Sequence, residues 1–497
     1  MERGKEGAFK LYNLRFLPLF AALFILGIFL VKVSEWVAAI LGITAILFIF
    51  LLWRTKSLKS GAAAILVAAL LVGYGAASLS LYLRNEVGLT GYHEVTCRAI
   101  EVTAGEESYA VLADEIRAEG SSYGGKIAFE TAEEITVGDR VTLSGEVSIK
   151  RLSLANIYTA LEYRKGAKYA IEADDVSVES GTPPLAYAVR EKVRALLVNY
   201  EGDRAGAFTY AMLFGDAEYM QDADKSAMRE VGVAHVFAVS GLHVGVLAAA
   251  FLFLLRKLRV KDGISLLILL PIFGFYAYLV GFTPSVLRAS IMVLVSLAAS
   301  ALGERYDGIS ALSFAAILIL LVRPLYLFDV SFLMSFLSIL GIHCLAEPIE
   351  KGFLRRRCKP WLASALALSL STTIALIPVS ATVFGRISLA GFALNILVVP
   401  LASLAYILTL IALLPTLVFP SFGALLGAIS FLPLFIAELS GKVASLGLTA
   451  SYEFSVVEIV LYYAILLFCG KYCLAKKKVK QVAGGTGAAI LLILICI

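Results

Sequence analysis

Charged residues are scarce in this chain of 497 residues: only 16% are Asp, Glu, Lys or Arg, whereas 60% are hydrophobic. The mean hydropathy is +0.86. A soluble protein is about one-quarter charged and about half apolar. No water-soluble fold hides this much apolar surface, so the composition excludes a soluble globular protein. It predicts a polytopic α-helical membrane protein.

Cysteine and histidine are also rare, with six and four residues respectively. Four of the cysteines lie within or at the ends of apolar segments, so their positions predict no disulfide framework; the six are at 97, 344, 358, 469, 473 and 496. Cys469 and Cys473 are spaced like two metal ligands, but no histidine or further cysteine is near them. We therefore expect no metal and no other cofactor.

Apolar runs of about 20 residues, the length that a membrane-spanning helix needs, recur along the chain. Residues 1–83 contain three, at 16–31, 36–53 and 61–83. The first resembles a signal peptide, but it lacks a small-residue cleavage site, so we expect a transmembrane helix. Later runs lie at 231–255, 264–281, 285–302, 309–322, 329–346, 361–383, 387–414, 421–447, 455–473 and, shorter, 483–497. The total is about 12 or 13 spans.

The apolar runs stop between residues 84 and 184, where 18 residues are acidic and 10 are basic. Alternation with period two predicts strands, with a turn at Gly138-Asp139 and a bulge at Gly145; the strand segments are 95–100, 109–112, 126–131, 135–149 and 169–178. Five short strands in about 90 residues predict a small all-β barrel of the OB type.

Three further segments follow the barrel. Residues 185–230 contain two amphipathic stretches, 186–200 and 204–215, which predict linker helices. Residues 231–475 hold the remaining long spans. Residues 476–497 form a basic loop and the short last apolar run.

Basic clusters predict the orientation, because positive residues collect in cytoplasmic loops. With the N-terminus in the cytoplasm, every dense cluster falls on the cytoplasmic face; they lie at 54–59, 256–261, 351–359 and 476–480. The barrel is then extracytoplasmic. An impermeant maleimide should label Cys97 in whole cells and spare Cys358.

Polar residues within the later spans predict a polar pathway, because a charged group at membrane depth costs a few kcal/mol and usually faces the bundle interior or water. Ser240 and His243 are expected to share one helix face, with His235 close to them. Arg288 lies about one turn inside a helix, and Asp329 stands at the mouth of a later span. The complete set of candidate channel or polar-core residues is His235, Ser240, Gly241, His243, Thr283, Pro284, Ser285, Arg288, Asp329, Ser331 and Asn395.

Structural explanations stay open for these residues. Either histidine could be a satisfied core residue, and Arg288 could snorkel or form a bridge with Asp329. Serine and glycine at helix interfaces normally indicate close packing. Pro378 and Pro400 predict broken helices in 361–383 and 387–414.

The barrel offers candidate DNA contacts, because OB-type barrels often bind single-stranded nucleic acid through aromatic and basic side chains. Its one basic stretch contains Lys150, Arg151, Arg164, Lys165 and Lys168. Solvated charges are the alternative explanation. The acidic balance of the domain argues against strong unaided binding.

Three strings resemble, in order and spacing, the ComEC family of inner-membrane competence proteins: HVFAVSGLHVG at 235–245, GFTPSVLRASIM at 281–292 and RPLYLFDVSFLMSF at 323–336. The resemblance covers residues 15–475. It implies the family's layout, with an extracytoplasmic OB-like domain, and a channel that passes single-stranded DNA across the cytoplasmic membrane during natural transformation. It implies no catalytic residue.

The resemblance also implies partners: single-stranded DNA, membrane lipid, a DNA receptor of the ComEA type and a cytoplasmic ATP-driven motor. It leaves a separate nuclease and a homo-oligomer open. Many relatives carry a C-terminal metallo-β-lactamase-like domain with an HxHxDH motif, and the histidines at 93, 235, 243 and 343 form no such cluster. The sequence has no P-loop, so we do not expect this chain to power transport itself.

Two other functions stay open. An intramembrane serine hydrolase would use Ser240 and His243, although a serine nucleophile usually takes its base from another segment. A secondary transporter of a small solute would usually have two similar hydropathic halves, and the sequence has no convincing repeat.

Overall fold

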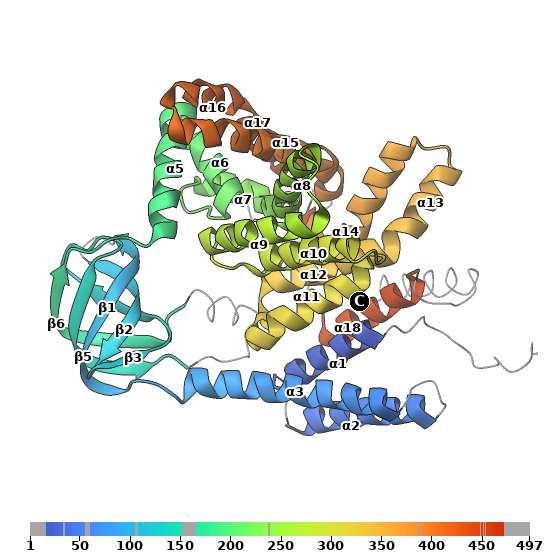
Figure 1. Cartoon of the computed structure of the whole chain (residues 1–497), viewed down its shortest axis with the longest axis horizontal. Helices are drawn as coiled ribbons and strands as arrows, with labels where there is room; N and C mark the ends of the chain where they lie inside the picture. The colour runs from blue at the N-terminus through green and yellow to red at the C-terminus, as the bar shows by residue number, and fades with distance from the viewer. Residues whose placement is uncertain are drawn as a thin grey trace, which may run out of the picture. The chain divides into compact units, whose positions relative to one another are not determined.

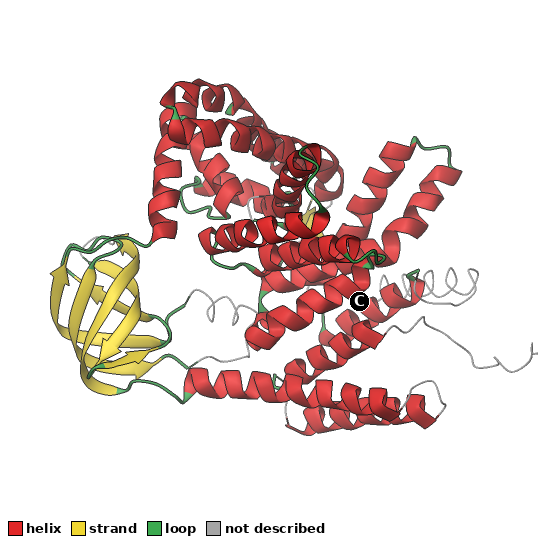
Figure 2. Ribbon diagram, in the orientation of Figure 1, coloured by secondary structure: helices red, strands yellow, loops and turns green. Residues whose placement is uncertain are grey.

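The computed structural model of the chain describes residues 16–32, 35–54, 60–104, 108–151, 166–236, 239–385, 387–388, 390–447, 449–450, 452 and 454–471. The chain divides into two compact units. Unit 1 comprises Met1–Pro18, Val193–Ala315 and Leu333–Ile497; unit 2 comprises Leu19–Lys192 and Ala316–Phe332. Figure 1 labels the elements, and Figure 2 shows that strands dominate one part of unit 2 whereas unit 1 is almost entirely helical.

Three apolar helices open unit 2: α1 (Phe16–Leu30), α2 (Glu35–Arg54) and α3 (Ser60–Asn85). Buried leucines and an isoleucine from all three form one hydrophobic cluster. Gly27 of α1 and Gly73 of α3 lie at a close crossing, since a methyl group on either would overlap the backbone of the other helix. Small residues allow this close approach between helices in a membrane.

The barrel of unit 2 has six strands: β1 (Gly91–Ala104), β2 (Tyr109–Ala118), β3 (Ser121–Tyr123), β4 (Ile127–Thr131), β5 (Arg140–Ile149) and β6 (Tyr169–Glu179). Their order is β1-β5-β6-β4-β2-β3, and β1 also pairs with β2. This pairing closes a ring in which only β4 and β6 are parallel. The closed ring confirms the predicted barrel of the OB type.

The bulge expected at Gly145 is confirmed, although the extra residue, Asp174, lies on the partner strand β6. A side chain at Gly145 would overlap the carbonyl oxygen of Glu172. Glycine therefore permits the close approach of the two strands at the irregularity.

Alternate residues of β1 fill the barrel, among them Val95, Cys97 and Ala99. Cys97 is only 2% exposed, and its Sγ lies 3.6 Å from the carbonyl oxygen of Val141. Burial, reinforced by the negative charge of Asp114, raises the pKa of the Cys97 thiol to about 12. The expectation that a maleimide labels Cys97 is therefore wrong for the folded barrel, because the thiol is enclosed and protonated.

Unit 1 is built from helices of many lengths. The segment Val193–Ala315 of this unit contains most of α5 and the helices up to the start of α11: α5 (Leu185–Glu201), α6 (Asp203–Phe214), α7 (Asp222–Glu230), α8 (Gly241–Lys257), α9 (Asp262–Leu279), α10 (Pro284–Ala301) and α11 (Gly308–Val322). The segment that begins at Leu333 contains most of α12 and the later helices: α12 (Val330–Gly341), α13 (Glu347–Arg355), α14 (Pro360–Phe384), α15 (Ala390–Val418), α16 (Gly423–Ile429), α17 (Phe431–Ala444) and α18 (Val456–Cys469). Two short strands, β7 (Ile387–Ser388) and β8 (Thr449–Ala450), pair with each other.

Within the described residues, seven helices are long and apolar enough to cross a membrane, and four shorter apolar helices accompany them. These helices confirm the polytopic class. The apolar α8, of 17 residues, stands where a further span is expected. The expected last span, 483–497, lies outside the described residues.

Two details of the helices differ from the expectations. The stretch 204–215 is not amphipathic: residues 205 to 214 of α6 are all buried, so α6 is a core helix of unit 1. The helices containing Pro378 and Pro400 are unbroken. Pro378 leaves the carbonyl of Ile374 without its helical donor, and the hydroxyl of Tyr462 donates to that carbonyl at 2.6 Å.

Candidate functional site

The Ser240–His243 pair that the sequence singles out stands at the start of α8. The helix begins at Gly241 and not at 231 as expected, because Ser240 is its N-cap residue. The Ser240 hydroxyl accepts the backbone N–H of Leu242 at 3.3 Å, and Nδ1 of His243 accepts the backbone N–H of Ser240 at 3.0 Å. This reciprocal arrangement is a capping box, which satisfies N–H groups that a helix start leaves without partners.

His235 is not part of α8. It lies in the short 3-10 helix η1 (Ala234–Val236), and its exposed ring makes a 3.2 Å hydrogen bond with the carbonyl of Gly232. Ser240 and His243 lie together as predicted, in the capping box. The placement of His235 in the same helical stretch is wrong, because α8 begins only after Ser240.

His243 connects α8 to a buried polar chain. Its ring packs on Tyr406 of α15, with 4.6 Å between the ring centroids. The Tyr406 hydroxyl donates to the hydroxyl of Tyr276 at 3.3 Å, and Tyr276 donates to the carbonyl of Leu213 at 3.1 Å. The sequence reasoning missed both tyrosines. The available signal was a phenol within an apolar run, since a buried hydroxyl usually finds a hydrogen-bond partner.

Arg288 lies in the second turn of α10, the helix that Thr283 precedes and Pro284 begins. The side chain is 5% exposed. Its Nη1 donates to the carbonyl of Ser335 on α12, and its guanidinium rests on Gly241, where an added methyl group would overlap Nη2. The structure therefore brings Gly241, Arg288 and the two helix starts together. A polar pathway through them stays a prediction.

Several buried polar atoms around these elements have no hydrogen-bond partner among the described residues. They are Nε of Arg288, Oγ1 of Thr283, and the hydroxyl oxygens of Ser290 and Ser335. Buried polar atoms of this kind normally bind water or a ligand. We define the N-terminal residues of α8, Arg288 and these atoms as the polar cluster.

The remaining candidates have separate surroundings. Asp329 precedes α12, and its Oδ1 accepts the backbone N–H of Ser331 at 2.7 Å, as an N-cap residue does. Asp329 and Ser331 belong to unit 2, so a pairing of Asp329 with Arg288 stays a prediction. Asn395 lies on α15 and makes no described hydrogen bond to Arg288 or His243; Pro284 and Ser285 are buried in the first turn of α10.

The polar cluster is electropositive. Each helix start carries roughly half a positive charge, and α8 and α10 present two such starts beside the Arg288 guanidinium. Among the described residues, no acidic side chain is hydrogen-bonded to or paired with Arg288. An anion with several oxygen acceptors, such as a phosphate group, suits this combination of charge and donors.

The predicted basic stretch of the barrel is largely engaged within unit 2. Lys168 Nζ donates to the carbonyls of Leu83 and Val87 at the end of α3, and Arg151 forms a 3.2 Å ion pair with Glu86. Burial, together with the charge of Arg84, lowers the pKa of Lys168. Lys150 is exposed, whereas Arg164 and Lys165 lie outside the described residues. DNA contact by this stretch stays a prediction, and Lys168 and Arg151 anchor the barrel to α3 in this structure.

Taken together, the helices and the barrel define a class: a multi-pass membrane protein with an OB-type domain. Comparison with known proteins narrows the class. Residues 212–477, more than half of the chain, match the family described as Competence protein, and the chain belongs to that family. This match confirms the resemblance to ComEC competence proteins and includes every unit 1 residue of the polar cluster.

Relatives match the chain over parts of their length. ComE operon protein 3 of Bacillus subtilis is 33% identical over 193 residues, which are 38% of this chain and 24% of that protein. Recombination protein 2 of Haemophilus influenzae is 23% identical over 397 residues, 74% of this chain and 48% of that protein. The chain thus spans less than half of either relative. No solved structure matches it.

Proposed function

We propose that this chain conducts single-stranded DNA across the cytoplasmic membrane during natural transformation. The observation that carries the proposal is Arg288, a buried cation beside two helix starts, without an acidic partner among the described residues of unit 1. A permanent positive charge at membrane depth is costly unless an anion or water offsets it. A DNA backbone brings one phosphate per nucleotide to such a site.

The family and the relatives support a role in DNA uptake. The matched region belongs to competence proteins, and the two relatives carry names from competence and recombination. The OB-type barrel adds a domain type that often binds single strands. Together these features favour DNA over a small solute as the transported anion.

The orientation and partners follow from the same proposal. The N-terminus and the basic clusters lie in the cytoplasm, and the barrel lies outside, where a DNA receptor of the ComEA type would deliver DNA. A cytoplasmic ATP-driven motor supplies the work. A nuclease on a separate chain or region removes the other strand.

Arg288 provides the test. Arg288→Met keeps a long, unbranched side chain but removes its charge, whereas Arg288→Lys keeps the charge. Because hydrogen bonds to a charged group contribute about 1.5–3 kcal/mol, Arg288→Met should lower DNase-resistant uptake of end-labelled duplex DNA by at least about tenfold. Arg288→Lys should retain most uptake.

The control is Arg305→Met, which removes the charge from an exposed arginine in the loop after α10. Each variant is compared for its amount in the membrane and for surface-bound label. Normal uptake with Arg288→Met would make Arg288 a packing residue and would remove the main support for the proposal. Equal loss with Met and Lys at normal abundance would contradict a role for the charge.

The hydrolase alternative has less support. Ser240 and His243 are engaged in the capping box, and no described residue hydrogen-bonds Nε2 of His243 to orient it as a base. A serine-reactive fluorophosphonate that labels the wild type but not Ser240→Ala would restore this alternative.

A further inference from the structure

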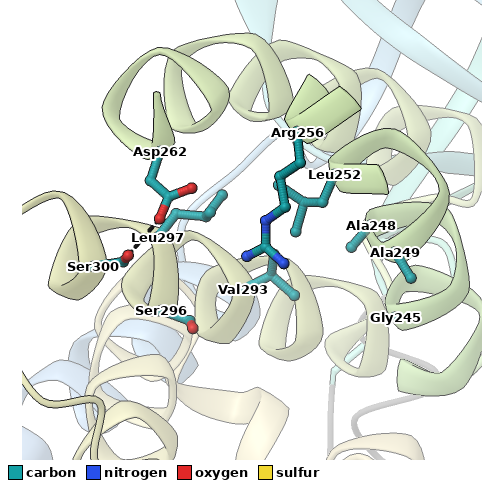
Figure 3. Close-up of a pocket in the computed structure, with 10 residues that line it drawn as sticks. All are labelled: Gly245, Ala248, Ala249, Leu252, Arg256, Asp262, Val293, Ser296, Leu297 and Ser300. Carbon is teal, nitrogen blue, oxygen red and sulfur yellow. Dashed lines mark hydrogen bonds between the residues drawn. The ribbon is translucent and has the colours of Figure 1, made fainter. Parts of the chain in front are cut away.

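A separate pocket of about 260 Å³ lies between α8, α9 and α10. Its lining follows α8 from Gly245 to Arg256, so its charged end lies at the opposite end of α8 from the polar cluster. Its walls come from α8 and α10 and combine small residues with larger apolar ones; the small ones include Gly245, Ala249 and Ser296, and the larger ones are Leu252, Val293 and Leu297. Its charged end contains Arg256 from the last turn of α8 and Asp262 from the first residue of α9. Figure 3 shows the Arg256 guanidinium directed into the pocket between these helices.

The two opposite charges of the pocket do not neutralise each other. Among the described residues, Arg256 and Asp262 form no ion pair, and the Arg256 side chain makes no hydrogen bond. The Asp262 carboxylate accepts a hydrogen bond from Ser300 through Oδ2 (Figure 3), and Oδ1 has no partner among the residues that the structure describes. A ligand that carries both a negative and a positive group would pair with both side chains at once.

The pocket extends from a membrane boundary into the apolar region of the spans. Asp262 begins one candidate span and Ser300 lies in the last turn of another, so the charged end stands at a membrane boundary. From Arg256 to Gly245 the wall of α8 runs eleven residues, or about 16 Å. This length is about half of the ~30 Å hydrocarbon core, the depth of one lipid leaflet.

We propose that this pocket binds one membrane phospholipid whose headgroup carries a primary ammonium, as in phosphatidylethanolamine. The lipid phosphate pairs with Arg256, and the ammonium donates to Asp262. The first part of one acyl chain lies along the small residues towards Gly245. This site does not depend on the proposed transport of DNA.

The lining discriminates between headgroups. A choline headgroup cannot donate hydrogen bonds and is usually held by aromatic rings, and no aromatic residue lines the pocket. A glycerol headgroup leaves the lipid with a net negative charge and brings no cation to Asp262. The carboxylate therefore favours an ammonium headgroup over both.

The test uses the full-length protein in vesicles of equal parts phosphatidylethanolamine and phosphatidylglycerol. The protein is re-extracted in mild detergent, and retained lipid is counted by native mass spectrometry. The wild type should retain one phosphatidylethanolamine, preferred over phosphatidylglycerol by at least about tenfold, the ratio that one charge-assisted hydrogen bond produces. Arg256→Gln should lose most of the retained lipid of both kinds.

Two variants separate the headgroup from the acyl chain. Asp262→Asn should retain lipid but lose the preference for phosphatidylethanolamine. Ala249→Leu fills the groove and should reduce retention of both lipids, whereas Ala250→Leu, on the same helix but outside the pocket, should not.

The matched control for charge is Lys257→Gln, next to Arg256 but outside the lining. Equal retention of the two lipids by the wild type would overturn the proposal. So would equal losses with Lys257→Gln and Arg256→Gln, because the effect would then be a general attraction of basic residues. Displacement of the lipid by equimolar glycerophosphoethanolamine would assign the pocket to a soluble zwitterion instead.

Discussion

At the start of α8, two side chains that resemble a nucleophile and its base stabilise a helix end. Ser240 and His243 each accept a hydrogen bond from a backbone N–H group. These bonds replace the carbonyl acceptors that the N–H groups at a helix start lack. In a membrane, where water does not fill this role, such compensation matters more. The same two residues therefore have a sufficient structural explanation without catalysis.

A helix cap and a catalytic nucleophile require different groups at Ser240. Ser240→Asn keeps a side-chain acceptor at the N-cap but removes the hydroxyl nucleophile, and Ser240→Ala removes both. Since losing an N-cap costs about 1 kcal/mol, Ser240→Ala should lower the thermal midpoint of the purified protein, whereas Ser240→Asn should stay near the wild type. Loss of DNA uptake by Ser240→Asn at unchanged stability would show that the hydroxyl acts chemically.

The sequence singled out charged candidates in the spans more readily than aromatic ones. Arg288 and Asp329 interrupt apolar runs, and a charge there is rare enough to be informative. Tyr406 is 1% exposed and Tyr276 is partly buried, but an aromatic residue in an apolar run is ordinary, so the phenol hydroxyl was only a weak signal. His235 was grouped with His243 from spacing alone, which gave no sign that the helix begins between them.

At the scale of elements, long apolar helices were predictable because their length and composition are fixed by the thickness of a bilayer. The response to proline was not predictable from the local sequence. The Ile374 carbonyl that Pro378 leaves free is satisfied by Tyr462, 88 residues further along the chain. Such a distant donor can be recognised only in the folded protein.

The crossing of α1 and α3 gives a test at this scale. Gly73→Ala places a methyl group against the backbone of Phe24, so the helices must separate; overpacking of this kind costs about 1–3 kcal/mol. Gly75→Ala, two residues further along α3, meets no atom within 4 Å. It should be neutral or stabilising, because alanine favours helix by about 1 kcal/mol over glycine.

Thermal unfolding of the two full-length variants in the same detergent compares them directly. Gly73→Ala should have the lower midpoint and faster proteolysis between α1 and α3. Equal midpoints would mean that the two helices adjust without cost and that Gly73 does not determine their approach.

For the whole molecule, the basic clusters predict which side of the membrane each segment occupies. The contacts within each unit do not determine this orientation. The inward-facing Cys97 is unsuited to a labelling test because it is 2% exposed and its pKa is raised. It becomes an internal control instead, since it should react only after the barrel is denatured. Exposed positions on both units are needed as reporters.

Tyr92 on β1 is 65% exposed and serves as the reporter of the barrel, and the exposed Lys359 serves as the reporter of the basic loop before α14. In chains whose cysteines other than Cys97 are replaced by serine, Tyr92→Cys should react with an impermeant maleimide in intact cells. Lys359→Cys should react only after permeabilisation. The reverse pattern would place the basic clusters outside the cell, contradict the positive-inside orientation, and require DNA to meet the polar cluster from the side opposite to the barrel.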